Sequence, residues 1–206
     1  STCKEAFDIV KKYELSLSED ALKALEIETV KELDNSIINI SGSVDRLCLE
    51  AKDILEKEGY DVELLTTSLD NEAKEVGNVL SAIARYQSKR DDKKAYILGG
   101  ETVVYLTGKG RGGRNQELAF ATVKGIAKLD NVTILSYSSD GTDGPTDAAG
   151  AYVDGNTMAK LENLGISYDD ILRDNNSYAA LEKIGQLIKT GPTGTNVNDC
   201  SIILIN

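Results

Sequence analysis

A glycine-rich basic run, GKGRGGR at residues 108–114, is the first part of this 206-residue sequence that could do chemistry. Its four glycines let the backbone approach a ligand and turn N–H groups toward it. A helix predicted to begin at Asn115 adds its positive N-terminal end, which favours phosphate or carboxylate. The forked guanidinium of Arg114 is best suited to hold such an anion with two hydrogen bonds. The candidate anion-binding residues are Lys109, Gly110, Arg111, Gly112, Gly113, Arg114 and Asn115.

This glycine-rich run does not match the common nucleotide fingerprints. No Gly-Lys-Ser/Thr follows it, so it is not a Walker loop. It also lacks an acidic residue at a strand end ~20 positions further on, which a dinucleotide-binding fingerprint requires. A flexible glycine hairpin with solvated basic side chains is therefore the alternative for this run on its own.

A second loop, residues 138–150, places Asp140, Asp143 and Asp147 within eight residues. Carboxylates beside hydroxyl groups could hold Mg²⁺, orient a water molecule, or accept a proton from a substrate hydroxyl. We therefore treat Asp140 and Asp143 as candidate catalytic residues, and all three aspartates as candidate metal ligands. The spacing is not that of an EF-hand, and tight turns and helix caps favour the same residue types.

A third loop, residues 190–199, is rich in glycine and threonine. Its hydroxyl and amide groups could donate hydrogen bonds to phosphate or carboxylate oxygens. A simple turn between the last two strands is the alternative. The candidate ligand-binding residues here are Thr193, Gly194, Thr195 and Asn196.

The composition excludes several classes of function. The net charge of −11 and the pI of about 4.6 argue against nucleic acid or an anionic membrane as a partner. The sequence has no histidine, which excludes Ser-His-Asp catalysis and His-ligated metal sites. Three scattered cysteines predict reduced thiols. No apolar run approaches the ~20 residues of a membrane span, and no signal peptide is recognised. We therefore expect a cytoplasmic protein.

Strands and helices alternate around the three loops. This alternation predicts a layered α/β/α domain with a mixed, largely parallel sheet. Because sites in open α/β sheets gather at the carboxyl ends of strands, we expect the loops to lie together. No Pro/Gly/Ser-rich linker divides the sequence, so we expect one α/β domain over residues 1–206, with residues 1–35 as a helical lead-in. Strands are expected at 36–41, 62–67, 95–98, 103–106, 132–137, 151–153, 187–189 and 202–205, and helices at 72–86, 115–129, 157–164 and 177–184, with further helical patterns within 6–25 and 47–55.

Four runs in order resemble the MOFRL family, the C-terminal part of class II glycerate kinases. They are GGET from Gly99, GKGRGGRNQELA from Gly108, SSDGTDGPTDAAGA from Ser138 and GPTGTNVND from Gly191. The MOFRL-like part covers about 95–206. The preceding SIINISGS and LTTSLDNEAKEVG are similar to the stretch that these kinases carry ahead of it, although Asn71 replaces their usual Gly.

The resemblance implies phosphoryl transfer from ATP to a hydroxyl of D-glycerate, with Mg²⁺, that is, a glycerate 2-kinase. Arg114 matches a residue associated with catalysis in the family. These kinases are roughly twice as long, so the resemblance also implies that an N-terminal domain is missing and that this chain is inactive alone. Some relatives carry the label hydroxypyruvate reductase, so an NAD(P)H-dependent reductase and a stand-alone small-anion-binding module remain alternatives. Whether the protein forms a homodimer is left open.

Overall fold

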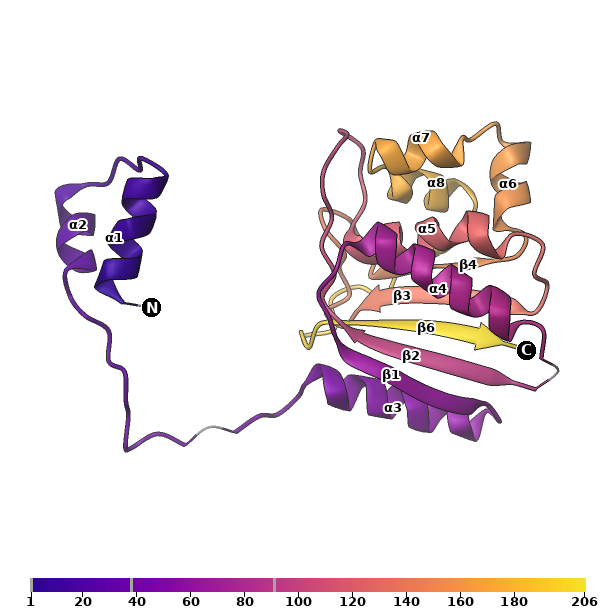
Figure 1. The fold of residues 1–206 in the computed structure, drawn as a ribbon, viewed down its shortest axis with the longest axis horizontal. Coiled ribbons are helices and arrows are strands. Elements are labelled where there is room, and N and C mark those ends of the chain that lie inside the picture. The colour runs from indigo at the N-terminus through magenta and orange to yellow at the C-terminus, as the bar shows by residue number, and fades with distance from the viewer. Residues whose placement is uncertain (1, 38, 91) are drawn as a thin grey trace. The chain divides into compact units, whose positions relative to one another are not determined.

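A computed structural model describes residues 2–37, 39–90 and 92–206 (Figure 1). The chain divides into two compact units, Ser1–Ile40 and Ser41–Asn206. The first unit contains helices α1 (Cys3–Lys12) and α2 (Glu19–Leu25). Thr2 and Glu5 form a capping box that starts α1, and Ser18 caps α2. Neither helix has a buried residue.

The strand expected at residues 36–41 is a wrong prediction for the described part of that segment. Residues 36, 37 and 39–41 belong to no helix or strand, and residue 38 lies outside the described residues. Ile37 and Ile40 are 89% and 82% exposed. An apolar pattern becomes a strand only when another strand offers backbone partners, and the sheet described below begins at residue 61.

The second unit is built on a six-stranded sheet of order β1-β2-β6-β3-β4-β5. β1 and β2 pair in parallel, and the other four neighbouring pairs are antiparallel. The prediction of a mixed sheet is confirmed, but its description as largely parallel is wrong. β6 returns from the last loop and inserts antiparallel to both β2 and β3, and β4 pairs antiparallel with β3 and β5. The strands are β1 (Asp61–Leu69), β2 (Lys94–Gly100), β3 (Val132–Ser138), β4 (Gly150–Asp154), β5 (Leu187–Ile188) and β6 (Asp199–Ile205).

Helices cover both faces of the sheet, which confirms the layered α/β/α class (Figure 1). One face packs the main core, centred on Phe120, Leu80 and Ile203. The other face packs a smaller core that includes Cys48 and Cys200, and α3 (Val44–Lys57) covers it. The helices of the main-core side are α4 (Ala73–Gln87), α5 (Arg114–Ile126), α6 (Thr157–Asn163), α7 (Tyr168–Arg173) and α8 (Ser177–Lys183).

Two further differences from the predicted elements concern short segments. The stretch 103–106 is not a strand, because only Val103 makes an isolated bridge, to Glu72. Helix α7 (Tyr168–Arg173), which begins after the cap residue Ser167, lies outside the predicted helices. Among the described residues, no helix is long and apolar enough to cross a membrane.

The sheet brings the chemically interesting loops to one edge. β2 ends at Gly100 and β3 ends at Ser138, and both residues pair with Asp199, where β6 begins. The N-terminus of α5 lies at the same edge, because Arg114 there contacts Asp199. This placement confirms that the three loops come together.

Candidate functional site

Arg114 is the centre of the site. It is the first residue of α5, directly after the cap residue Gly113. Its Nε and Nη2 donate to Oδ2 and Oδ1 of Asp199 at 2.6 and 3.0 Å, a two-bond fork. Its Nη1 lies 3.0 Å from Oε1 of Glu101. The hydrogen bonds to Asp199 raise the pKa of Arg114, so the guanidinium is charged.

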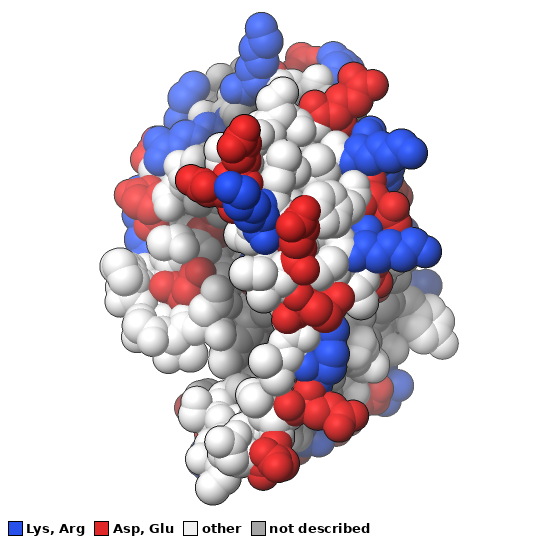
Figure 2. Space-filling view, turned by 90° about the vertical axis from the view of Figure 1, so that its left-hand side faces the viewer, with Lys and Arg blue, Asp and Glu red and all other residues white. Residues whose placement is uncertain are grey.

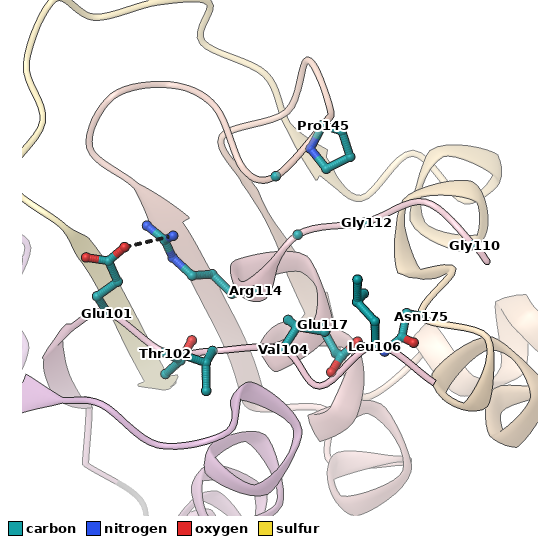
Figure 3. Close-up of a pocket in the computed structure, with 13 residues that line it drawn as sticks. Glu101, Thr102, Val104, Leu106, Gly110, Gly112, Arg114, Glu117, Pro145 and Asn175 are labelled. Atoms are coloured by element: carbon teal, nitrogen blue, oxygen red, sulfur yellow. Dashed lines mark hydrogen bonds and ion pairs between the residues drawn. The ribbon is translucent and has the colours of Figure 1, made fainter. Parts of the chain in front are cut away.

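A cavity of about 670 Å³ opens beside Arg114 (Figure 3). Segment 101–106, which follows β2, forms one wall, and the start of α5 forms another. The lining combines charged groups with an apolar surface, as is usual for small-molecule sites. It consists of Glu101, Thr102, Val103, Val104, Leu106, Gly110, Gly112, Gly113, Arg114, Glu117, Gly144, Pro145 and Asn175.

Asp143, a predicted catalytic residue, caps α5 from a distant loop. Its Oδ1 accepts hydrogen bonds from N and Nδ2 of Asn115, and its Oδ2 accepts from N and Nε2 of Gln116. It is 2% exposed. Burial raises the pKa of Asp143, although these hydrogen bonds act in the opposite direction. Both oxygens are thus engaged in holding the helix that carries Arg114.

Asp140 lies where the second and third loops meet. Its Oδ1 accepts from Ser138 Oγ and from N and Oγ1 of Thr142. Burial alone raises the pKa of Asp140, but these hydrogen bonds outweigh burial and hold it below its ordinary value. Thr193 connects the loops, because its N donates to Asp140 O and its Oγ1 donates to Ser139 O. Asp140 Oδ2 accepts no hydrogen bond from any described residue.

In the third loop, Thr193 and Asn196 are partly used by the loop itself. Thr195 N donates to Thr193 Oγ1, and Asn198 N donates to Asn196 Oδ1. Gly194 has a positive φ of 76°, a conformation that glycine adopts without strain. The N–H groups of Gly194 and Asn196 have no acceptor among the described residues.

Asp147 and Arg111 belong to a separate surface cluster around Tyr178. Asp147 accepts from Tyr178 Oη at 2.7 Å and from Lys189 Nζ at 3.0 Å. Arg111 stacks over the Tyr178 ring and donates to a backbone carbonyl. Hydrogen bonds from Tyr178 and Lys189 lower the pKa of Asp147. The three aspartates of the second loop therefore have three different sets of partners. Among the described residues, no three acidic or cysteine side chains lie together in a group that could hold a metal ion.

Most backbone amides of the glycine-rich run serve the fold. Lys109 N donates to Asp174 Oδ1, Gly110 N to Asp174 O and Arg111 N to Asn176 Oδ1. Lys109 is not among the described residues that line the cavity. In the described part of the chain, the N–H groups of the next three residues have no acceptor. These are Gly112, Gly113 and Arg114, all of which line the cavity.

The structure adds three site residues that the sequence did not single out. Asp199 and Glu101 hold the Arg114 guanidinium, and Glu117 lies on the cavity wall one turn further along α5. Glu101 follows the glycine pair at the end of β2 and belongs to the run GGET. Glu117 belongs to the run GKGRGGRNQELA. Both residues therefore lie within the sequence runs that resemble the MOFRL family. Asp199 is the last residue of the third loop and of the run GPTGTNVND, and the antiparallel insertion of β6 brings it to Arg114.

Comparison with known proteins agrees with this arrangement. The profile of the MOFRL family matches residues 94–199. The chain belongs to the MOFRL family. It is 45% identical to the D-glycerate 2-kinase of Thermotoga maritima over 209 residues, and 38% identical to the glycerate 2-kinase of Pyrococcus horikoshii over 214 residues. These alignments include 100% and 98% of this chain.

A solved structure supports the same relationship. The crystal structure of glycerate kinase from Thermotoga maritima matches the whole chain with a TM-score of 0.88 and 44% identity, and 51% of that protein is covered. The chain likewise spans 50% and 48% of the two curated relatives, about half of their length.

Basic and acidic side chains are interspersed on the face shown in Figure 2.

Proposed function

We propose that this chain is the C-terminal half of an ATP-dependent glycerate 2-kinase. The observation that carries the proposal is the 45% identity to a D-glycerate 2-kinase along the whole chain. In the proposed reaction, a hydroxyl oxygen of D-glycerate forms a bond to the terminal phosphorus of ATP. The bond from that phosphorus to the bridging oxygen breaks, ADP leaves, and the hydroxyl proton passes to a base. Such reactions depend on positioning and charge neutralisation more than on covalent help.

Arg114 is proposed to hold the transferring phosphoryl group or the substrate carboxylate. A guanidinium has five N–H donors. The two hydrogen bonds to Asp199 use two of them, and Nη1 forms an ion pair with Glu101. The buried Asp199 fixes the orientation of the guanidinium. Glu101 has a side chain that is 52% exposed, so an incoming anion could replace it without unpacking the core. The unpaired N–H groups of Gly112 and Gly113 would supply further donors.

Asp140 is proposed to face the reacting hydroxyl. Its lowered pKa keeps it ionised at neutral pH, and its Oδ2 is unengaged by described residues. The N–H groups of Gly194 and Asn196 and the hydroxyl of Thr195 would donate to phosphate oxygens. Asp143 is assigned a positioning role, because both of its oxygens hold α5.

The residues fit Mg²⁺ in a limited way. Mg²⁺ is usually held by one or two carboxylates together with phosphate oxygens and water. Because the three aspartates lie apart, Asp140 is the aspartate that we assign to Mg²⁺ binding. Glu101, which forms an ion pair with Arg114, is a second candidate carboxylate. When bound, the ion would neutralise phosphate charge. The part of the relatives that lies outside this chain would complete the site, and Lys109, Arg111 and Asp147 would lie at its margin.

The role of Arg114 can be tested in the longer protein in which we propose that this chain is joined to an N-terminal half. Arg114→Lys keeps the positive charge beside Asp199 but loses the fork. We expect turnover of D-glycerate to fall by about tenfold or more, with the thermal midpoint nearly unchanged. Lys124→Arg, on the exposed face of the same helix, is the control. Wild-type turnover in the Arg114→Lys variant would overturn the assignment.

A further inference from the structure

Glu117 is a buried carboxylate that the proposed phosphoryl transfer does not use. It is 3% exposed and lines the cavity (Figure 3). Asn175 Nδ2 donates to Glu117 Oε2 at 2.9 Å. Glu117 Oε1 accepts no hydrogen bond from any described residue. Burial raises the pKa of Glu117, so the fold bears a cost for keeping a carboxylate there.

Asn175 holds Glu117 in a fixed orientation. It adopts a positive φ of 53°, and its Oδ1 accepts from Thr107 N and Gly108 N at 2.8 and 3.0 Å. Its amide is therefore locked by the backbone of the adjoining loop. One Glu117 oxygen is pinned by this amide, which leaves the other as an open acceptor.

The position of Glu117 shows which part of a ligand it can reach. Arg114 and Glu117 are three residues apart on α5, so their Cβ atoms are about 5–6 Å apart on one helix face. Asp140 acts electrostatically on the Arg114 end, and the loops 138–142 and 190–196 contribute no residue to the cavity lining. Under the proposed function the phosphoryl transfer takes place at Arg114, and Glu117 would face a part of the substrate that does not react.

We propose that Glu117 binds a non-reacting hydroxyl of the acceptor substrate and so selects short hydroxy acids that carry a second hydroxyl. This inference rests on the proposed kinase function. Arg114 would hold the anionic end of the substrate, and Glu117 would accept a hydrogen bond from the hydroxyl at the other end. D-Lactate, which has a methyl group in place of the hydroxymethyl group of D-glycerate, would leave Glu117 Oε1 without a hydrogen bond.

The test compares D-glycerate with D-lactate in the longer protein. For the wild type we expect kcat/KM to favour D-glycerate by about tenfold or more. Glu117→Ala should lose most of this preference through a fall in kcat/KM for D-glycerate, with that for D-lactate changed less than about threefold. Glu162→Gln, an exposed glutamate of α6, should behave as wild type.

The outcomes separate the two proposals. Wild-type protein that forms no ADP with either substrate overturns the kinase function itself. An active wild type whose preference survives in Glu117→Ala overturns the role of Glu117 alone. Should Glu117→Ala fail to fold, the isosteric Glu117→Gln decides: a reduced preference supports the inference, and an unchanged preference overturns it.

Discussion

Replacing Asp143 by Ala tests whether this residue holds α5 in place. Asp143 is 2% exposed and accepts hydrogen bonds from N of Asn115 and N of Gln116 at 3.1 and 2.9 Å, and from Gln116 Nε2 at 3.0 Å. Each buried donor left without an acceptor costs about 1–3 kcal/mol. Loss of a negative group at a helix N-terminus adds about 0.3–1 kcal/mol. The desolvation that raises the pKa of Asp143 offsets part of this loss.

We therefore expect Asp143→Ala to lower the free energy of unfolding by about 2–4 kcal/mol. Urea unfolding of the 206-residue chain, followed by far-ultraviolet circular dichroism, measures this change. Asp130→Ala, at an exposed position after α5, is the control and should stay within about 0.5 kcal/mol of wild type. A change of the same small size in Asp143→Ala would refute the capping role and return Asp143 to the candidate metal or catalytic residues.

Three further variants probe stability by the same unfolding assay. Burial raises the pKa of Glu117 above its ordinary 4.5, so the folded state binds the Glu117 proton more tightly than the unfolded state does. At pH 7 the Glu117→Gln variant should therefore be more stable than the wild type. This advantage should shrink as the pH falls through the folded-state pKa of Glu117. Gly77→Ala would place a Cβ 2.5 Å from the carbonyl oxygen of Leu118. We expect the free energy of unfolding to fall by about 1–3 kcal/mol, despite the better helix propensity of alanine. An unchanged free energy of unfolding would contradict the close packing of α4 on α5. Phe120→Ala empties a fully buried position that stacks on Tyr168 and should cost about 3–5 kcal/mol, whereas a loss below 1 kcal/mol would contradict its place in the core.

The regular elements were predictable where the apolar pattern was strong. The helix expected at 72–86 is α4 (Ala73–Gln87), and the strand expected at 132–137 is β3 (Val132–Ser138). Periodicity reports which side chains are buried, but it carries no information on strand direction. The antiparallel insertion of β6 and the exposed segment at 36–41 depend on partners far away in the sequence, so local patterns could not reveal them.

The site was predictable in its location more than in its contacts. The three loops were expected to lie together, and they meet at one edge of the sheet. The N-terminus of α5 was expected to attract an external anion. Two of its N–H groups instead donate to Asp143, and composition alone could not show this. The same limitation hid Asp199, because its importance comes from a contact across 85 residues of sequence.

The most direct test of the proposed function is a coupled assay of ADP formation by the longer protein with Mg·ATP and D-glycerate. The account predicts ADP that forms only when D-glycerate is present, together with an equal amount of phosphoglycerate. It also predicts no turnover by the 206-residue chain alone, although that chain should bind D-glycerate or Mg·ATP in a calorimetric titration. Turnover by the isolated chain would contradict its role as half of a site. Absence of glycerate-dependent ADP from the longer protein, or oxidation of NADH with hydroxypyruvate instead, would contradict the kinase function.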